Sequence, residues 1–154
     1  MKSKAKALYI HIPFCRNICT YCDFKKFIYN QKRIDDYFKS LFLDLQQYSH
    51  KKYKSIYIGG GTPSCIDYQN LKSLLEHLKT LLDKNYVEFC IESNVEDINE
   101  DFLKILCENK VNRLSIGVQT FNEKFIKFCG RKHTKKQAIE NIKLASKYIK
   151  NLSI

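Results

Sequence analysis

The 154-residue chain lacks any long hydrophobic run, and no apolar stretch approaches the roughly 18 residues that would span a bilayer. Its lysine-rich start, Met1–Lys6, is followed by no apolar signal-peptide core. The sequence also has no low-complexity segment and no linker rich in proline, glycine or serine. These absences predict a soluble, cytoplasmic protein whose residues 1–154 form one domain without a membrane span.

Acidic residues are few relative to basic ones, and the formal net charge is +11. Such a charge raises the question of a nucleic-acid partner. The lysines, however, are spread along the whole chain, often on presumptive helix faces, instead of being clustered with aromatic residues on one element. We therefore expect a solvated basic surface and no nucleic-acid site.

Cysteine is the residue whose pattern stands out. Cys15, Cys19 and Cys22 follow the spacing Cys-x3-Cys-x2-Cys. Three cysteine thiolates, with no fourth cysteine at a matching spacing, can hold three irons of a [4Fe–4S] cluster and leave the remaining iron open to a small molecule. A structural zinc site normally needs a second pair of ligands, and a disulfide framework normally needs an oxidising compartment and an even count, whereas this chain has seven cysteines. The other four are scattered singly, at Cys65, Cys90, Cys107 and Cys129.

Short apolar runs alternate with longer stretches of helical periodicity, which predicts the order βαβαβα. Strands are expected near Ala7–Ile12, Ser55–Ile58, Tyr86–Glu92 and Arg113–Val118. Helices are expected near Ile34–Tyr48, Tyr68–Leu82, Asp101–Asn109, Glu123–Phe128 and Lys135–Lys150. This alternation predicts an α/β fold with a parallel sheet joined by right-handed crossovers.

In parallel sheets, ligands gather at the carboxyl ends of the strands. Four notable segments fall at such ends: the cysteine loop, residues 59–64 (Gly-Gly-Gly-Thr-Pro-Ser), residues 92–94 (Glu-Ser-Asn) and residues 119–120 (Gln-Thr). The three glycines allow close backbone approach to a ligand, or merely a tight turn. They do not form a Walker A loop, because no Gly-Lys-Ser/Thr follows them.

The polar residues at these ends each have two interpretations. Glu92 would bind a ribose diol or an ammonium group, or else pair with a nearby lysine or arginine. Gln119 would contact a ligand or merely cap the loop that leads to the next helix. Arg131 lies between two predicted helices, where a guanidinium can meet a carboxylate in bidentate fashion. We do not interpret His133 as a base or a metal ligand.

Four ordered motifs together resemble the radical S-adenosylmethionine (SAM) superfamily, within it the branch of oxygen-independent coproporphyrinogen III oxidase and its haem-chaperone relatives. The motifs are Tyr9-Ile10-His11-Ile12-Pro13-Phe14-Cys15 with Cys19-Thr20-Tyr21-Cys22-Asp23-Phe24, then Ile58-Gly59-Gly60-Gly61-Thr62-Pro63-Ser64, then Arg113-Leu114-Ser115-Ile116-Gly117-Val118-Gln119-Thr120-Phe121, and last Gly130-Arg131-Lys132-His133-Thr134. The resemblance covers nearly the whole chain.

This resemblance implies that Cys15, Cys19 and Cys22 hold a [4Fe–4S] cluster whose open iron is chelated by SAM. Reductive cleavage of SAM would then give methionine and a 5′-deoxyadenosyl radical, with an electron donor such as flavodoxin or ferredoxin. In relatives, positions that match Tyr9, Tyr21, Gly60, Gly61, Thr62 and Glu92 contact SAM or line its pocket. Positions that match Gln119 and Arg131 contact a second SAM or the substrate region.

Within this branch, the Cys-Asp-Phe form at Cys22, Asp23 and Phe24 resembles the haem-chaperone subgroup, because the oxidases tend to have a further cysteine where Phe24 stands. The partner implied is haem or a porphyrinogen, whose propionates suit a basic surface. Val95 departs from the branch, which usually has proline there.

The resemblance further implies a six-strand partial TIM-like barrel with a C-terminal domain, of which about four βα units are present here. We therefore expect residues 1–154 to be the N-terminal part of the core domain, as a truncated product, half of a split gene or a fragment. A complementary C-terminal chain is an expected partner, since an open parallel sheet leaves an unpaired edge.

Overall fold

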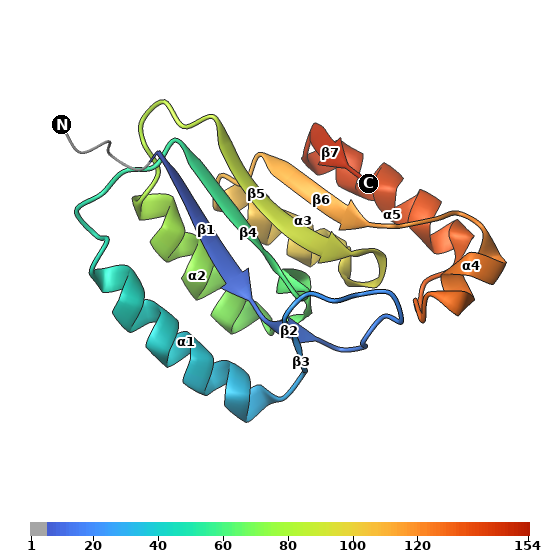
Figure 1. Cartoon of the computed structure of the whole chain (residues 1–154). Coiled ribbons are helices and arrows are strands. Elements are labelled where there is room, and N and C mark those ends of the chain that lie inside the picture. The colour runs from blue at the N-terminus through green and yellow to red at the C-terminus, as the bar shows by residue number, and fades with distance from the viewer. Residues whose placement is uncertain (1–5) are drawn as a thin grey trace.

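A five-stranded parallel sheet organises the computed structural model, which describes residues 6–154. The strands lie in the order β1, β4, β5, β6, β7, and every pair of neighbours is parallel (Figure 1). Their bounds are β1 Ala7–Ile12, β4 Ser55–Gly60, β5 Glu88–Asn94, β6 Arg113–Gly117 and β7 Asn151–Ser153. The predicted α/β fold with a parallel sheet is thus confirmed.

Strand order in this sheet never reverses along the sequence. When each new strand is added on the same side of the previous one, right-handed crossovers place all connecting helices on one face of the sheet. This is the arrangement of a (β/α) barrel, whereas a doubly wound sheet has helices on both faces. The structure is therefore part of a barrel wall, opened between β1 and β7 (Figure 1).

The connecting helices start directly after polar residues that cap them. Their bounds are α1 Gln31–Gln46, α2 Tyr68–Thr80, α3 Glu100–Glu108, α4 Glu123–Phe128 and α5 Lys135–Tyr148. Helix α1 begins three residues before the predicted start, because the Asn30 side chain accepts a hydrogen bond from the Arg33 amide and caps the helix there. At α5, Thr134 and Gln137 form a reciprocal capping box.

The core lies between the sheet and these helices. The central strand β5 buries the consecutive apolar residues Phe89, Cys90 and Ile91, as parallel strands do when both faces are covered. Its neighbour β4 buries Ile56 and Ile58 and leaves Tyr57 half-buried between them. Helices α2 and α3 contribute fully buried side chains such as Leu74, Leu78 and Phe102. Among the described residues, no helix has the length and apolar character needed to cross a membrane.

Two strands end later than predicted, and both extensions lead into the candidate site. Strand β4 continues into the glycine run, where Gly59 and Gly60 still pair with β1. Strand β5 runs from residue 88 to residue 94 and not from 86 to 92, so that Ser93 and Asn94 pair with β6. A fifth strand that was not among those predicted, β7, pairs with residues 113–115.

Four short elements were not predicted. The strands β2 (Phe14–Cys15) and β3 (Phe27–Ile28) pair in parallel and bring together the two ends of the cysteine loop. The 3₁₀ turns η1 (Pro63–Cys65) and η2 (Val95–Asp97) follow β4 and β5. Elements of two or three residues are too short for a sequence period to reveal them.

Candidate functional site

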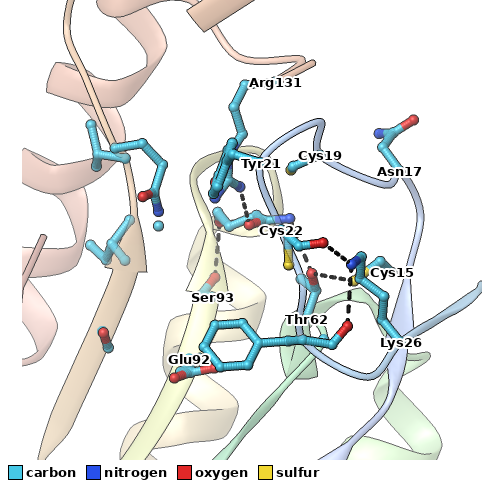
Figure 2. Close-up of a pocket in the computed structure, with 18 of the residues that line it drawn as sticks. Cys15, Asn17, Cys19, Tyr21, Cys22, Lys26, Thr62, Glu92, Ser93 and Arg131 are labelled. Carbon is cyan, nitrogen blue, oxygen red and sulfur yellow. Dashed lines mark hydrogen bonds between the residues drawn. The ribbon is translucent and has the colours of Figure 1, made fainter. Parts of the chain in front are cut away.

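A cavity of about 840 Å³ opens at the carboxyl ends of the strands. It is lined by all four segments that the sequence places at strand ends and by the loop before α5 (Figure 2). Among the predicted site residues, these line it: Cys15, Cys19, Tyr21, Cys22, Gly60, Gly61, Thr62, Glu92, Gln119 and Arg131. Tyr9 is not among the lining residues. The volume lies within the range typical of small-molecule and cofactor sites.

The cysteine loop has a fixed base and a more exposed tip. Cys15 is buried in β2, whereas Cys19 and Cys22 are half-buried. At the base, the Phe27 amide donates to the Pro13 carbonyl at 2.7 Å, and the Tyr29 amide donates to the Cys15 carbonyl at 2.8 Å. All three sulfurs face the same cavity, although within residues 6–154 no three His, Cys, Asp or Glu side chains are gathered closely enough to hold a metal ion directly.

The tip of the loop is held by a segment more than a hundred residues away. The Thr20 hydroxyl donates to the Phe128 carbonyl at 3.1 Å, and the Thr20 amide donates to the Cys129 carbonyl at 3.4 Å. The Arg131 guanidinium donates to the Tyr21 hydroxyl at 2.9 Å (Figure 2). The loop between α4 and α5 therefore positions the outer two cysteines.

A buried carboxylate anchors the other side of the cysteine loop. Asp97 forms an ion pair with Arg16 and accepts a hydrogen bond from the Ser64 hydroxyl at 2.7 Å. Arg16 also donates to the Cys65 carbonyl at 2.9 Å. Burial raises the pKa of Asp97, an effect that Ser64 and Arg16 partly offset. This cluster was not predicted, because single polar residues in three separate segments of the sequence leave no spacing signal.

The glycine run serves both as a turn and as a point of close approach. Gly60 has a φ of +119°, and a Cβ there would lie 2.7 Å from atoms of the His11 ring. A Cβ on Gly61 would lie 2.7 Å from the Phe14 carbonyl oxygen. The Gly61 and Thr62 amides instead donate to the carbonyls of Ile12 and Phe14. The tight turn is thus confirmed, and the approach of a ligand to these glycines stays a prediction.

Glu92 is held by a phenol and a backbone amide. The Tyr57 hydroxyl donates to its Oε1 at 2.6 Å, and the Gly60 amide donates to its Oε2 at 3.2 Å. Among the described residues, no lysine or arginine forms an ion pair with Glu92. Burial, followed by this hydrogen bond to Glu92, raises the pKa of Tyr57 well above its ordinary value. Tyr57 therefore stays a donor, and the carboxylate is left to face the cavity.

Tyr9 lies beside this pair and outside the cavity. Its ring stacks on Tyr57 with 6.1 Å between centroids, and its hydroxyl is 2.9 Å from Nδ1 of His11. The ring is about half exposed. Its contact with SAM remains a prediction.

Arg131 binds an amide and a phenol, and not the carboxylate that the sequence analysis considered. Its partners are Oδ1 of Asn94 and the hydroxyl of Tyr21, while its buried Nε has no hydrogen-bond partner. Asn94 was not among the predicted site residues, and its place on the cavity wall follows from the later end of β5.

Gln119 does not cap the following loop. That role belongs to the Thr120 hydroxyl, which accepts from the Asn122 amide at 3.1 Å, and to Asn122, which caps α4. Gln119 itself has a φ of +67° and lines the cavity. His133 is buried 3.7 Å from the Glu96 carboxylate, and burial lowers the pKa of its imidazole. It does not line the cavity.

The sequence profile described as "Radical SAM superfamily" matches residues 9–154, and the chain belongs to this superfamily. The family implies a [4Fe–4S] cluster and SAM. The chain is 41% identical over 148 residues to "Heme chaperone HemW" of Lactococcus lactis, covering 96% of this chain and 39% of that protein. The protein of the same name from Bacillus subtilis is 38% identical over 146 residues, which is 91% of this chain and 38% of that protein.

Among solved structures, coproporphyrinogen III oxidase (HemN) from Escherichia coli, described as a radical SAM enzyme, is similar to this chain. The TM-score is 0.84 at 25% sequence identity, covering 95% of this chain and 35% of that one. The chain thus spans about two fifths of the length of the curated relatives it matches.

The two glycines with positive φ provide a test of the turn. Gly130→Ala should lower the free energy of unfolding by about 1–2 kcal/mol, because its φ of +72° is left-handed but the nearest atoms lie 3.8 Å or more from a Cβ. Gly60→Ala should cost roughly 3 kcal/mol or more, because the new Cβ also collides with His11. Urea denaturation measures both, and equal losses would contradict the close approach at Gly60.

Proposed function

We propose that the cavity binds a [4Fe–4S] cluster through Cys15, Cys19 and Cys22, with SAM beside it. The observation that carries this proposal is that three thiols, the glycine turn and the Glu92 carboxylate line one cavity. Three soft thiolate donors in a loop of eight residues suit iron–sulfur ligation. The volume of the cavity and its mixed polar and apolar lining suit a nucleotide-sized ligand.

The roles of the residues follow from their contacts. Such a cluster, with one iron left open to SAM, supplies the electron for radical generation. Tyr57 and the Gly60 amide orient Glu92, so that its carboxylate can accept hydrogen bonds from a ribose diol or an ammonium group. Gly60, Gly61 and Thr62 line the cavity together with Cys15, and Tyr21 forms part of the wall.

Gln119 and Arg131 line the cavity from the loop that follows β6 and from the loop before α5. In this proposal they contact a second SAM or the substrate. The charge of the Arg131 guanidinium on the cavity wall suits an anionic group.

At the level of the whole protein, we place the chain with the haem chaperones of porphyrin and haem metabolism. Support comes from the 41% and 38% identities to proteins of that name and from Asp23 and Phe24 on the cavity wall. The net charge of +11 suits haem propionates. A flavodoxin or ferredoxin would supply electrons, and a complementary C-terminal chain or segment would complete the barrel.

The alternative function is oxygen-independent coproporphyrinogen III oxidase, which decarboxylates porphyrinogen propionates oxidatively. The structural similarity to that enzyme, with a TM-score of 0.84, favours this alternative. A third outcome is that residues 1–154 hold the cofactors but are inactive without a second chain.

The first prediction concerns the cluster. After anaerobic reconstitution, the unaltered chain should bind four irons and give an electron paramagnetic resonance signal on reduction with dithionite. Adding SAM should shift that signal. Cys19→Ala should lose the cluster, whereas Cys107→Ala should keep it, because Cys107 is exposed on α3 and does not line the cavity. Equal iron contents in the two variants would contradict the assignment of Cys19.

The second prediction concerns Glu92. Glu92→Gln in the reconstituted protein should weaken SAM binding by about tenfold or more, because a charge-assisted hydrogen bond is replaced by a neutral one. Glu88→Gln is the matched control, since Glu88 lies on the same strand but pairs with Arg113 and does not line the cavity. Calorimetric titration measures both affinities. A similar loss in the two variants would argue against a direct contact.

The third prediction separates the chaperone from the oxidase. A chaperone should bind haem at one equivalent per chain, seen as a Soret shift, and release no CO₂ from coproporphyrinogen III in the presence of SAM and reductant. Release of CO₂ would favour the oxidase. If the reconstituted chain does neither while its cluster still responds to SAM, the third outcome holds.

A further inference from the structure

A line of hydrogen bonds runs from Arg131 through Asn94 and Thr62 to the sulfur of Cys15. Arg131 Nη1 bonds to Asn94 Oδ1, Asn94 Nδ2 lies 3.3 Å from Thr62 Oγ1, and Thr62 Oγ1 lies 3.3 Å from Cys15 Sγ. These four residues, here called the relay, come from the loop before α5, the end of β5, the glycine turn and β2. Figure 2 shows its Thr62–Cys15 end.

The direction of every bond in the relay is fixed by its first member. A guanidinium has only donors, so the amide oxygen of Asn94 must face Arg131. The amide nitrogen of Asn94 is then turned toward Thr62 and donates to its oxygen. Because the Thr62 oxygen already accepts from this donor, its single hydroxyl proton is left to point at the Cys15 sulfur.

The surroundings hold the relay in this arrangement. Thr62 and Cys15 are 5% and 6% exposed. The backbone amide of Asn94 donates to the Ser64 hydroxyl at 3.2 Å, and Ser64 is itself bonded to buried Asp97. Gly117 leaves room for the Arg131–Asn94 contact, since a Cβ there would lie 3.0 Å from Arg131 Nη2 and 3.4 Å from Asn94 Oδ1.

We infer that Asn94 is a positioning residue, which orients the Thr62 hydroxyl as a donor to the Cys15 sulfur and thereby raises the reduction potential of the bound cluster. A hydrogen bond to a ligand sulfur stabilises the more negative, reduced state of an iron–sulfur cluster. The inference rests on the proposed function in one respect, namely that Cys15 is a cluster ligand.

Asn94→Asp tests the direction of the relay with almost no change in shape. The new carboxylate still accepts from Arg131, but it has no donor for Thr62, so the Thr62 proton turns to the carboxylate and leaves the sulfur. The midpoint potential of the reconstituted cluster should become more negative by about 59 mV, which is a tenfold change for a one-electron couple. The potential is measured by redox titration with electron paramagnetic resonance.

The charge added by Asn94→Asp would also lower the potential, and a double-mutant comparison separates the two effects. Thr62→Val removes the donor in an isosteric side chain and should lower the potential alone, while Thr62→Ser should keep it near that of the unaltered chain. In the Thr62→Val background, Asn94→Asp should then shift the potential much less than it does alone.

Two results would overturn the inference. The first requires that the cluster assembles in all variants. Either the midpoint potential is then unchanged in Thr62→Val, or Asn94→Asp shifts it equally in the unaltered chain and in the Thr62→Val background. In that case the proposed function stands and the relay does not tune the cluster. The second is the absence of a cluster from the unaltered chain under conditions that load a known [4Fe–4S] protein, which would remove the proposed function together with the inference.

Discussion

The close approach of the glycine turn to the base of the cysteine loop is the contact on which the rest of the site depends. The amides of Gly61 and Thr62 reach the carbonyls of Ile12 and Phe14 only because Gly61 has no Cβ. That contact puts the Thr62 hydroxyl against the Cys15 sulfur and brings the Gly60 amide to Glu92. A side chain at either glycine would separate the loop that carries the thiols from the turn that faces them.

Two carboxylates held by hydrogen bonds, buried Asp97 and half-buried Glu92, then fix the site from the sides. Asp97 ties Arg16, next to Cys15, to the turn after β4, and Tyr57 holds Glu92 through a phenol whose pKa is raised. A buried carboxylate needs such partners to offset the loss of water. In each case a hydroxyl group supplies a bond to the carboxylate. The cavity therefore has walls whose polar atoms are already oriented before any ligand binds.

Much of this arrangement was predictable from periodicity and from motifs. The bounds of β1 and α4 agree with the sequence prediction, and ten predicted site residues line one cavity, because parallel strands end on one edge of a sheet. The start of α1 was misplaced because the cap at Asn30 lies outside the apolar period. The sequence did not indicate the roles of Asp97 and Tyr57, and for Asn94 it indicated only the strand end at which the residue lies. Each of the three forms a hydrogen bond with a residue 32 to 35 positions away in the chain.

The docking of the cysteine loop on residues 128–131 bears on the order of folding. The Thr20–Phe128 and Tyr21–Arg131 contacts join positions 108 and 110 residues apart. Closing so long a loop costs entropy that only the intervening strands and helices can offset, so these contacts form late. The cysteine loop therefore reaches its final shape only after α4 and the segment that follows it have been made. Until then the three thiols lack the contacts that fix the outer part of their loop.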